Sequence, residues 1–83
     1  MDEAELRADR LRIEEANLAK AEQDITAGQM RITEQELRIE ALRAGGRDTT
    51  QAEQLLRNLE ETLAQWNGHR AEIVRVIGSL RGL

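Results

Sequence analysis

The residues of this chain that could do acid–base or metal chemistry are one histidine and a scattered set of carboxylates. His69 is the only histidine, and Glu72 follows it by three residues. A zinc site usually needs three or four protein ligands, so a metal at His69 would require ligands from further copies of the chain. A surface histidine is the simpler interpretation, and we predict neither a metal nor a cofactor.

The carboxylates do not form the set that a di-iron bundle uses. They include Glu14-Glu15, Glu22, Asp24 and Glu60-Glu61. A di-iron bundle carries Glu-x-x-His on two of its helices. Here the residue three positions before the histidine is Trp66, so the best-known catalytic use of a small bundle is excluded.

The sequence supports neither nucleophilic catalysis nor phosphate binding. Ser79 is the sole serine and stands ten residues after His69, and the chain has no cysteine for a thiolate or disulfide. Gly45-Gly46 lacks the preceding strand and the Lys-Ser/Thr of a phosphate-binding loop. We therefore predict that the protein is not an enzyme.

The elements that carry these residues are helical by composition. The 83 residues contain no proline, phenylalanine or tyrosine, and Trp66 is the only aromatic residue. Abundant Ala, Glu, Leu, Arg and Gln is typical of long helices and coiled coils. The net charge of −4 argues against nucleic-acid binding. No segment is long and apolar enough for a membrane span, and no signal peptide precedes the helices, so we expect a complete cytoplasmic protein.

The first predicted helix covers about residues 2–44 and repeats every seven residues. One apolar position of its heptad is filled by Ala4, Leu11, Leu18, Ile25, Ile32 and Ile39. The companion position is weak, because it holds Arg7, Glu14, Ala21, Gly28, Gln35 and Leu42. A second, partial stripe on the other side of the later half comprises Ala27, Met30, Leu37, Ala41 and Ala44. That stripe indicates that this helix touches two neighbours.

A turn over residues 45–49 separates this helix from a second. Paired glycines suit a helix C-terminus, where glycine adopts positive φ without a steric penalty. Thr50-x-x-Glu53 and Asp48-x-x-Gln51 are competing capping boxes for the next helix. So short a connection favours an antiparallel hairpin.

The second predicted helix covers about residues 50–81 and has a cleaner seam. Apolar residues alternate in steps of four and three, and Arg70 is the only interruption. The seam contains Ala52, Leu56, Leu59, Leu63, Trp66, Ile73, Ile77 and Leu80. Leu55, Val74 and Val76 widen the apolar surface on its flanks.

Folding the two helices together predicts specific neighbours. If Ala44 stands opposite Thr50, facing residue numbers sum to about 94, which places Ala21 near Ile73 and Leu18 near Ile77. Gly28 then faces Trp66, whose bulk would fill the missing side chain and make Gly28→Leu destabilising.

The same register brings Arg70 to Asp24, with Glu22 as the alternative. Arg70 either fixes the register from within the seam or extends to water at its edge.

One hairpin leaves apolar residues uncovered. Met30, Leu37, Leu55, Val74 and Val76 would be exposed on a monomer, and pairing two hairpins into a four-helix bundle would cover them. We therefore predict an all-α, antiparallel two-helix coiled-coil hairpin that forms a homodimer. The rival is a different, unidentified protein partner. The predicted interface and packing residues are Gly28, Met30, Leu37, Leu55, Trp66, Arg70, Val74 and Val76.

The segment from Arg38 to Ile73 resembles a family of small helical-hairpin proteins common in alphaproteobacteria. The resemblance rests on Gly46-Arg47-Asp48-Thr49, Leu55-Leu56, Leu59-Glu60-Glu61-Thr62-Leu63 and His69-Arg70. It implies a hairpin and a bacterial origin. The family has no assigned function, so the resemblance implies no activity.

The sequence thus predicts a structural module for protein–protein interaction and oligomerisation. Two alternatives stay open: a ligand- or metal-binding accessory bundle in stress or signalling, and a coiled-coil segment of a larger signalling protein. A buried polar pocket or a bound ion between the helices would favour the first alternative.

Overall fold

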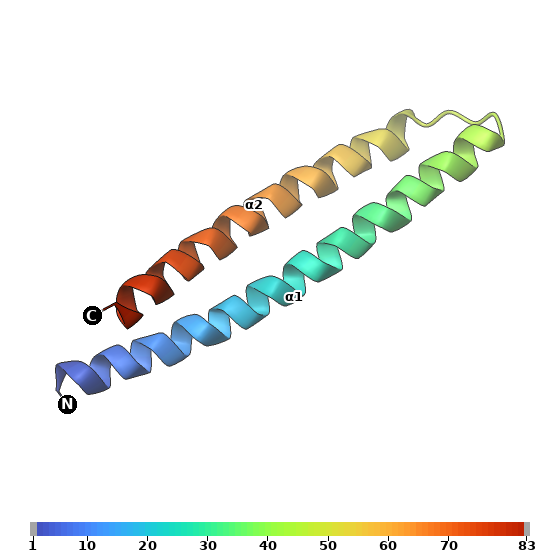
Figure 1. Cartoon of the computed structure of the whole chain (residues 1–83). Helices are drawn as coiled ribbons and strands as arrows, with labels where there is room; N and C mark the ends of the chain where they lie inside the picture. Colours follow the sequence, from blue (N-terminus) through green and yellow to red (C-terminus); the bar gives the residue numbers. More distant parts are fainter. Residues whose placement is uncertain (1, 83) are drawn as a thin grey trace.

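The computed structural model describes residues 2–82 and contains two helices packed side by side in opposite directions (Figure 1). Helix α1 spans Glu3–Ala44 and α2 spans Thr50–Arg81. The expected ranges were about 2–44 and 50–81. The hairpin is a rod of 66 × 16 × 14 Å with both termini at one end. The prediction of an all-helical antiparallel hairpin is confirmed for the described residues.

Helix α1 begins with a side-chain cap. The Oδ1 atom of Asp2 accepts a hydrogen bond of 2.8 Å from the backbone N–H of Glu5, satisfying a donor that has no partner within the helix. Glu3 and Glu5 place negative charge at the positive end of the helix dipole. With no proline to interrupt it, the helix continues for 42 residues.

Helix α1 ends in a Schellman motif at the two glycines. Gly46 adopts φ +68°, and its N–H donates to the carbonyl of Arg43 at 3.0 Å. The N–H of Arg47 donates to the carbonyl of Leu42 at 2.9 Å. These bonds satisfy the last carbonyls of the helix, and the left-handed residue turns the chain out of the helix axis. The expected role of the glycine pair as a helix stop is confirmed.

The start of α2 differs from both predicted capping boxes. Thr49 occupies the N-cap position and makes no capping hydrogen bond through its side chain. The Oδ1 atom of Asp48 instead accepts from the backbone N–H of Thr50 at 3.0 Å and from its hydroxyl at 2.7 Å. Asp48 therefore organises the turn through residue i+2, as in an Asx-turn, and the Thr50–Glu53 box is wrong.

The buried core is a narrow strip along the seam. Its buried hydrophobic residues are Ala21, Ile25, Ile39, Ile73 and Ile77. Ala21, Ile73 and Ile77 form one cluster, against which Leu11 and Leu18 pack. The remaining large seam residues of α2 are partly buried. The seven-residue repeat of each helix therefore identifies the face that meets the other helix.

Gln35 is the one buried polar side chain in the described chain, at 7% exposure. Its Nε2 donates to the carbonyl of Ala52 at 2.9 Å. A buried amide without a partner would cost stability, so this bond explains how the seam tolerates a polar residue. It also ties α1 directly to the first turn of α2.

The register between the helices differs from the expected one in the middle of the rod. A Cβ atom built on Gly28 would lie 3.5 Å from Cδ1 of Leu63 and would have no other side-chain neighbour within 4 Å. The residue numbers of this pair sum to 91 rather than 94. Trp66 therefore does not fill the space at Gly28, and that expectation is wrong.

The connection explains the change of register. After Gly46 the chain runs back alongside α1 before α2 begins, so Thr50 is set back from Ala44 (Figure 1). Helix α2 then extends to the first turns of α1, where Leu80 borders a shallow hollow with Leu6 and Arg10. The N-terminal end of α1 therefore projects only a short way beyond the end of α2.

Replacing Gly28 with alanine should stabilise the hairpin. Alanine is favoured over glycine inside a helix by up to about 1 kcal/mol, and the new Cβ would make ordinary contact with Leu63. We expect thermal unfolding followed by circular dichroism to show a higher midpoint for Gly28→Ala. Gly68→Ala is the matched control, because a Cβ there would meet nothing within 4 Å. A fall for Gly28→Ala with a rise for Gly68→Ala would contradict the packing.

Asp48 should contribute stability that depends on pH. Hydrogen bonds from the hydroxyl and then the backbone N–H of Thr50 hold the pKa of Asp48 below its usual value of 3.8. A carboxyl with a lowered folded-state pKa stabilises the fold above its unfolded pKa and loses that effect as pH falls through the folded value. Asp48→Ala should lower the melting midpoint at pH 7, and the difference from the native chain should shrink below about pH 4.

Asp48→Asn is the control for this titration, because it keeps an acceptor oxygen and cannot ionise. Its difference from Asp48→Ala should stay constant with pH. A native-minus-alanine difference that is the same at pH 7 and pH 2 would contradict the role of the charge.

Candidate interaction surface

Charged side chains of the two helices pair along one edge of the rod. Arg81 binds Glu15 at 2.6 Å, Arg70 binds Glu22 at 3.3 Å and Arg43 binds Glu53 at 3.0 Å. Glu15, Glu22 and Arg43 are separated by multiples of seven residues, so they share one side of α1. This edge already has its ionic partners within the hairpin.

Arg70 is at the surface and not within the seam. Its guanidinium contacts Glu22 through both Nε and Nη2, and its side chain is 46% exposed. Asp24, the first expected partner, instead accepts a hydrogen bond of 2.7 Å from Lys20. The pairing with Asp24 is wrong, the alternative with Glu22 is confirmed, and Arg70 reaches water at the edge of the seam.

The one aromatic residue lies on a flank of α2. The rings of Trp66 and His69 meet edge to face with centroids 5.9 Å apart. Together with Thr62 and Gln65 they border a shallow hollow that is open to solvent. His69 is therefore an exposed neighbour of the tryptophan, which agrees with the surface interpretation.

The outward side of α1 carries the largest exposed hydrophobic residues. Leu6, Ile13, Met30 and Leu37 are each 55–60% exposed. They belong to a second heptad, offset from the seam, whose positions alternate in steps of three and four from Ile13 to Ala44. We call this set the outer stripe; it comprises Ile13, Ala16, Lys20, Gln23, Ala27, Met30, Glu34, Leu37, Ala41 and Ala44, with Leu6 one heptad before Ile13.

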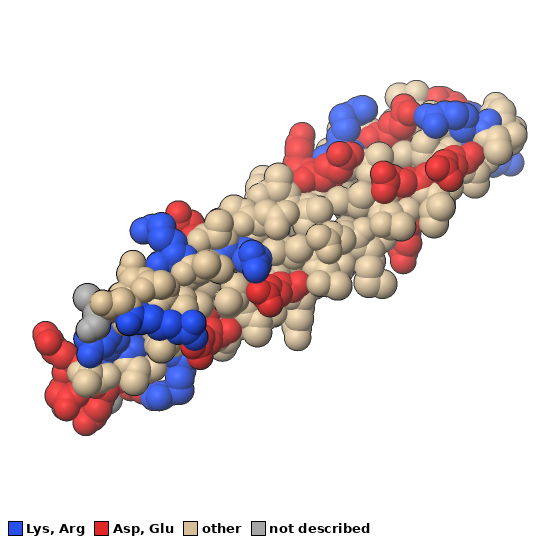
Figure 2. All heavy atoms as spheres, in the orientation of Figure 1, with Lys and Arg blue, Asp and Glu red and all other residues tan. Residues whose placement is uncertain are grey.

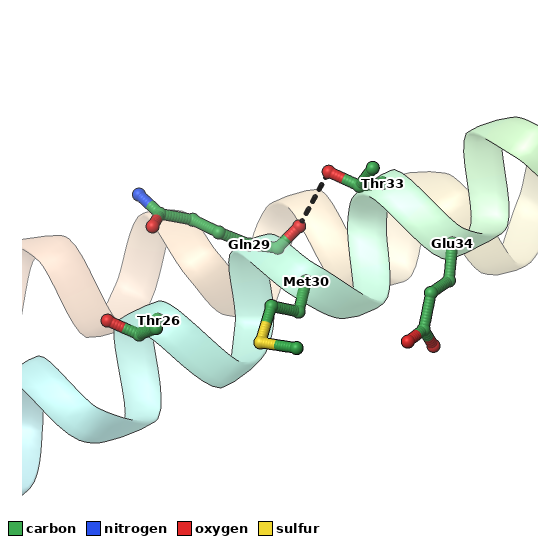
Figure 3. A pocket seen from close by; sticks show the side chains of 5 residues that line it. All are labelled: Thr26, Gln29, Met30, Thr33 and Glu34. Carbon is green, nitrogen blue, oxygen red and sulfur yellow. Dashed lines mark hydrogen bonds between the residues drawn. The ribbon is translucent and has the colours of Figure 1, made fainter.

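Figure 3 shows the middle of the outer stripe. Met30 projects from α1 on the side away from α2, and Glu34 follows it one turn later. Thr26 and Thr33 border the same shallow hollow, and the hydroxyl of Thr33 donates to the carbonyl of Gln29 at 3.1 Å. That internal bond satisfies the hydroxyl, so the surface around Met30 presents mainly apolar and small groups.

The middle of the rod is free of formal charge on both helices. Residues 25–30 of α1 and 62–69 of α2 contain no Asp, Glu, Lys or Arg, and the Gly28–Leu63 contact places the two segments side by side. Figure 2 accordingly shows mainly tan, uncharged residues over the centre of the visible face, with most of the blue and red charged residues towards both ends. A neutral centre with a charged periphery is the usual composition of a protein–protein interface.

The interface residues predicted from sequence do not share one face. Met30 and Leu37 lie on the outer stripe, while Leu55 is exposed on α2 and Val76 is half-buried. Val74 is also exposed, but two residues along a helix turn it about 200° from Val76. Gly28 and Trp66 belong to the seam and its flank. One flat partner surface therefore cannot cover the whole predicted set.

Sequence reasoning missed two members of the outer stripe. Leu6 and Ile13 are as exposed as Met30 and Leu37. The signal was present, because Ile13 stands 14 residues before Ala27 and 24 before Leu37, in phase with the second heptad. Charged neighbours in the first half of α1 obscured it.

Some of the carboxylates pair with cations of the same chain. Glu72 binds Arg75 at 2.7 Å, and the hydrogen bond and charge of Arg75 lower the pKa of Glu72. Within residues 2–82 no three His, Cys, Asp or Glu side chains gather in a way that could hold a metal ion. Neither described helix has an apolar stretch long enough to cross a membrane.

No family model, curated protein or solved structure matches this chain. The resemblance to the alphaproteobacterial hairpins stays a prediction. We therefore infer function from the surfaces of the hairpin.

The Arg70–Glu22 contact should be a weak, salt-sensitive link between the helices. Exposed ion pairs contribute about 0.2–1 kcal/mol because water and salt screen them. A double-mutant cycle with Glu22→Gln and Arg70→Gln should give a coupling in this range at low salt, decreasing in 1 M salt. The matched cycle with Asp24→Asn and Arg70→Gln should give no coupling. Equal couplings in both cycles would contradict the observed pairing.

Proposed function

We propose that this protein is a structural module that acts by protein–protein contact and forms a homodimer of two hairpins, four helices in all. It works without catalysis and without a cofactor. The observation that carries the proposal is the balance of apolar burial: five hydrophobic residues are buried, while six large ones remain 44–60% exposed.

The size of the buried core supports association. Two helices each bury one stripe, and small domains of this kind have little hydrophobic area with which to offset the entropy of folding. Covering Leu6, Ile13, Met30 and Leu37 would add apolar burial along most of the length of α1. A second copy offers a surface of the same length and spacing, and a twofold dimer is the commonest closed arrangement.

The distribution of exposed residues favours α1 over α2 as the contact helix. Met30 and Leu37 of the predicted interface share one stripe, whereas Leu55, Val74 and Val76 are divided between the flanks of α2. The dimer therefore leaves the exposed side chains of α2, including Leu55 and Val74, in contact with water. Binding of a different protein partner is the competing outcome.

The mass of the particle in solution tests the proposal. We expect light scattering after gel filtration at tens of micromolar to give twice the 9.4 kDa of one chain. The melting midpoint should also rise with protein concentration, because dimerisation stabilises the folded chain by mass action. A mass of one chain throughout this range, with a concentration-independent midpoint, would contradict self-association.

A further inference from the structure

We propose that the half of the rod next to the turn binds an acidic amphipathic helix of a different protein, along the edge that has no ion pairs between α1 and α2. The bound helix lies beside both helices as the third member of a bundle, with its carboxylates towards the arginines of α1. This inference goes beyond the proposed homodimer and does not depend on it, because the dimer leaves the exposed side chains of α2 in contact with water.

The two edges of the hairpin differ in their side chains. Among residues 2–82, the three ion pairs between the helices lie on one edge, which includes Glu22 of α1 and Glu53 of α2. A step of two residues turns a side chain by about 200°, which leads from Glu22 to Asp24 and from Glu53 to Leu55 on the other edge. Residues at multiples of seven from Asp24 and Leu55 share that edge. We call it the open edge; next to the turn its outermost residues are Arg31, Arg38, Leu55, Thr62 and His69.

The open edge next to the turn carries positive charge without a negative partner. Arg31 and Arg38 are exposed, and within the described residues neither has a carboxylate within ion-pair distance. Asp24, one heptad before Arg31, is held by Lys20 of its own helix at 2.7 Å. Carboxylates from another molecule can therefore reach both arginines without displacing a contact of the hairpin.

Helix α2 supplies the apolar part of the same edge. Leu55 is 48% exposed, and the half-buried Trp66 borders a hollow open to solvent with Thr62 and His69. On the α1 side, a Cβ atom built on Gly28 would have only Leu63 as a side-chain neighbour within 4 Å. An amphipathic helix binds such a surface through its own apolar face.

The spacing of the arginines specifies the partner. Arg31 and Arg38 are seven residues apart, which is about 10 Å along α1. A helix with acidic residues at the same seven-residue spacing presents carboxylates to both arginines while its apolar face meets Leu55 and Trp66. Complementary charge of this kind selects one partner over others that have a similar apolar face.

A second copy of this chain lacks the carboxylates that the open edge needs. The same edge of a copy brings two further arginines in this half, and like charges repel. Glu36 and Glu60 have no cation partner in the described chain, but they lie on the ion-paired edge. Contact between opposite edges would add copies without closing into a dimer. An acidic helix of a different protein is therefore the occupant that fits.

A titration with a designed helix tests the chemistry of the partner. The probe is a tryptophan-free peptide of about three heptads, with leucine at the two seam positions and glutamate beside them. Trp66 is the only tryptophan of the chain, so its fluorescence reports on the open edge. We expect the glutamate peptide to shift the Trp66 emission to shorter wavelength and to saturate at one peptide per hairpin. Binding should weaken in about 1 M salt. The same peptide with lysine in place of glutamate should leave the emission unchanged.

Charge reversal tests the arginines. Arg31→Glu combined with Arg38→Glu should weaken binding of the glutamate peptide about tenfold, because two attractions become repulsions. The same variant should bind the lysine peptide. Arg12→Glu combined with Arg57→Glu is the matched control, because it changes the net charge equally on other faces. It should alter the affinity by less than about twofold. Arg12 binds Asp9 in its own chain, so circular dichroism should confirm an unchanged helix content.

Apolar truncation separates the open edge from the surface of the proposed dimer. Leu55→Ala should weaken binding of the glutamate peptide and leave the mass of the free protein unchanged. Leu37→Ala, at an exposed position of the outer stripe, should weaken the dimer and leave peptide binding unchanged. The reverse pattern would contradict the assignment of the two surfaces.

The outcomes decide between the occupants. Equal emission shifts with both peptides, no saturable shift with the glutamate peptide, or an unchanged affinity in the Arg31 and Arg38 double variant would overturn the acidic-helix site. A free protein heavier than two chains, which returns to two chains in that variant, would assign the open edge to further copies of this chain. A monomer by light scattering with saturable binding of the glutamate peptide would overturn the homodimer and support the acidic-helix site.

Discussion

The reversal of the chain at Gly46 is the constraint on which the rest of the structure depends. Gly46 adopts φ +68°, which ends α1 and lets the N–H groups that follow the helix bond to its last carbonyls. Glycine adopts this dihedral angle without a side-chain clash. The connection that follows sets α2 back along α1, and Asp48 holds its first turn. Each contact along the rod, from Gln35 with Ala52 to Arg81 with Glu15, follows from where α2 begins.

The consequence of this geometry is a long molecule with little interior. Two helices in a rod 66 Å long and about 15 Å across can bury only the strip where they touch. Isoleucines, one alanine and Gln35 occupy the buried positions, and the larger leucines remain partly open to solvent. Large hydrophobic side chains therefore remain exposed outside the seam, and most of them are on α1. Association is the physical outcome that such a distribution favours.

Much of the fold could be predicted from sequence, because heptad spacing, glycine pairs and the absence of proline act locally. The seam could be identified for the same reason, and Ala21 with Ile73 joined one cluster as expected. The register in the middle of the rod could not, because it depends on the path of five connecting residues, whose dihedral angles propensity alone does not fix. Hence Gly28 lies against Leu63, three residues from the expected Trp66, and Arg70 pairs with Glu22, two residues from the expected Asp24. The sequence predicted correctly that Met30, Leu37, Leu55 and Val74 are exposed. It did not predict that they lie on different faces of the hairpin, which only the structure shows.

The charges of this protein separate into two groups with different consequences. Pairs such as Arg43 with Glu53 and Arg81 with Glu15 close the hairpin on one edge and have their partners already. The charges bordering the outer stripe have mixed signs: Arg12 and Glu40 lie along one side of it, and Arg10, Asp24, Arg31 and Arg38 lie along the other. Between these charges the large apolar residues Ile13, Met30 and Leu37 remain exposed. Exposed charges contribute little stability individually because water and salt screen them. In this chain the exposed apolar residues of α1 therefore favour association more than its surface charges do.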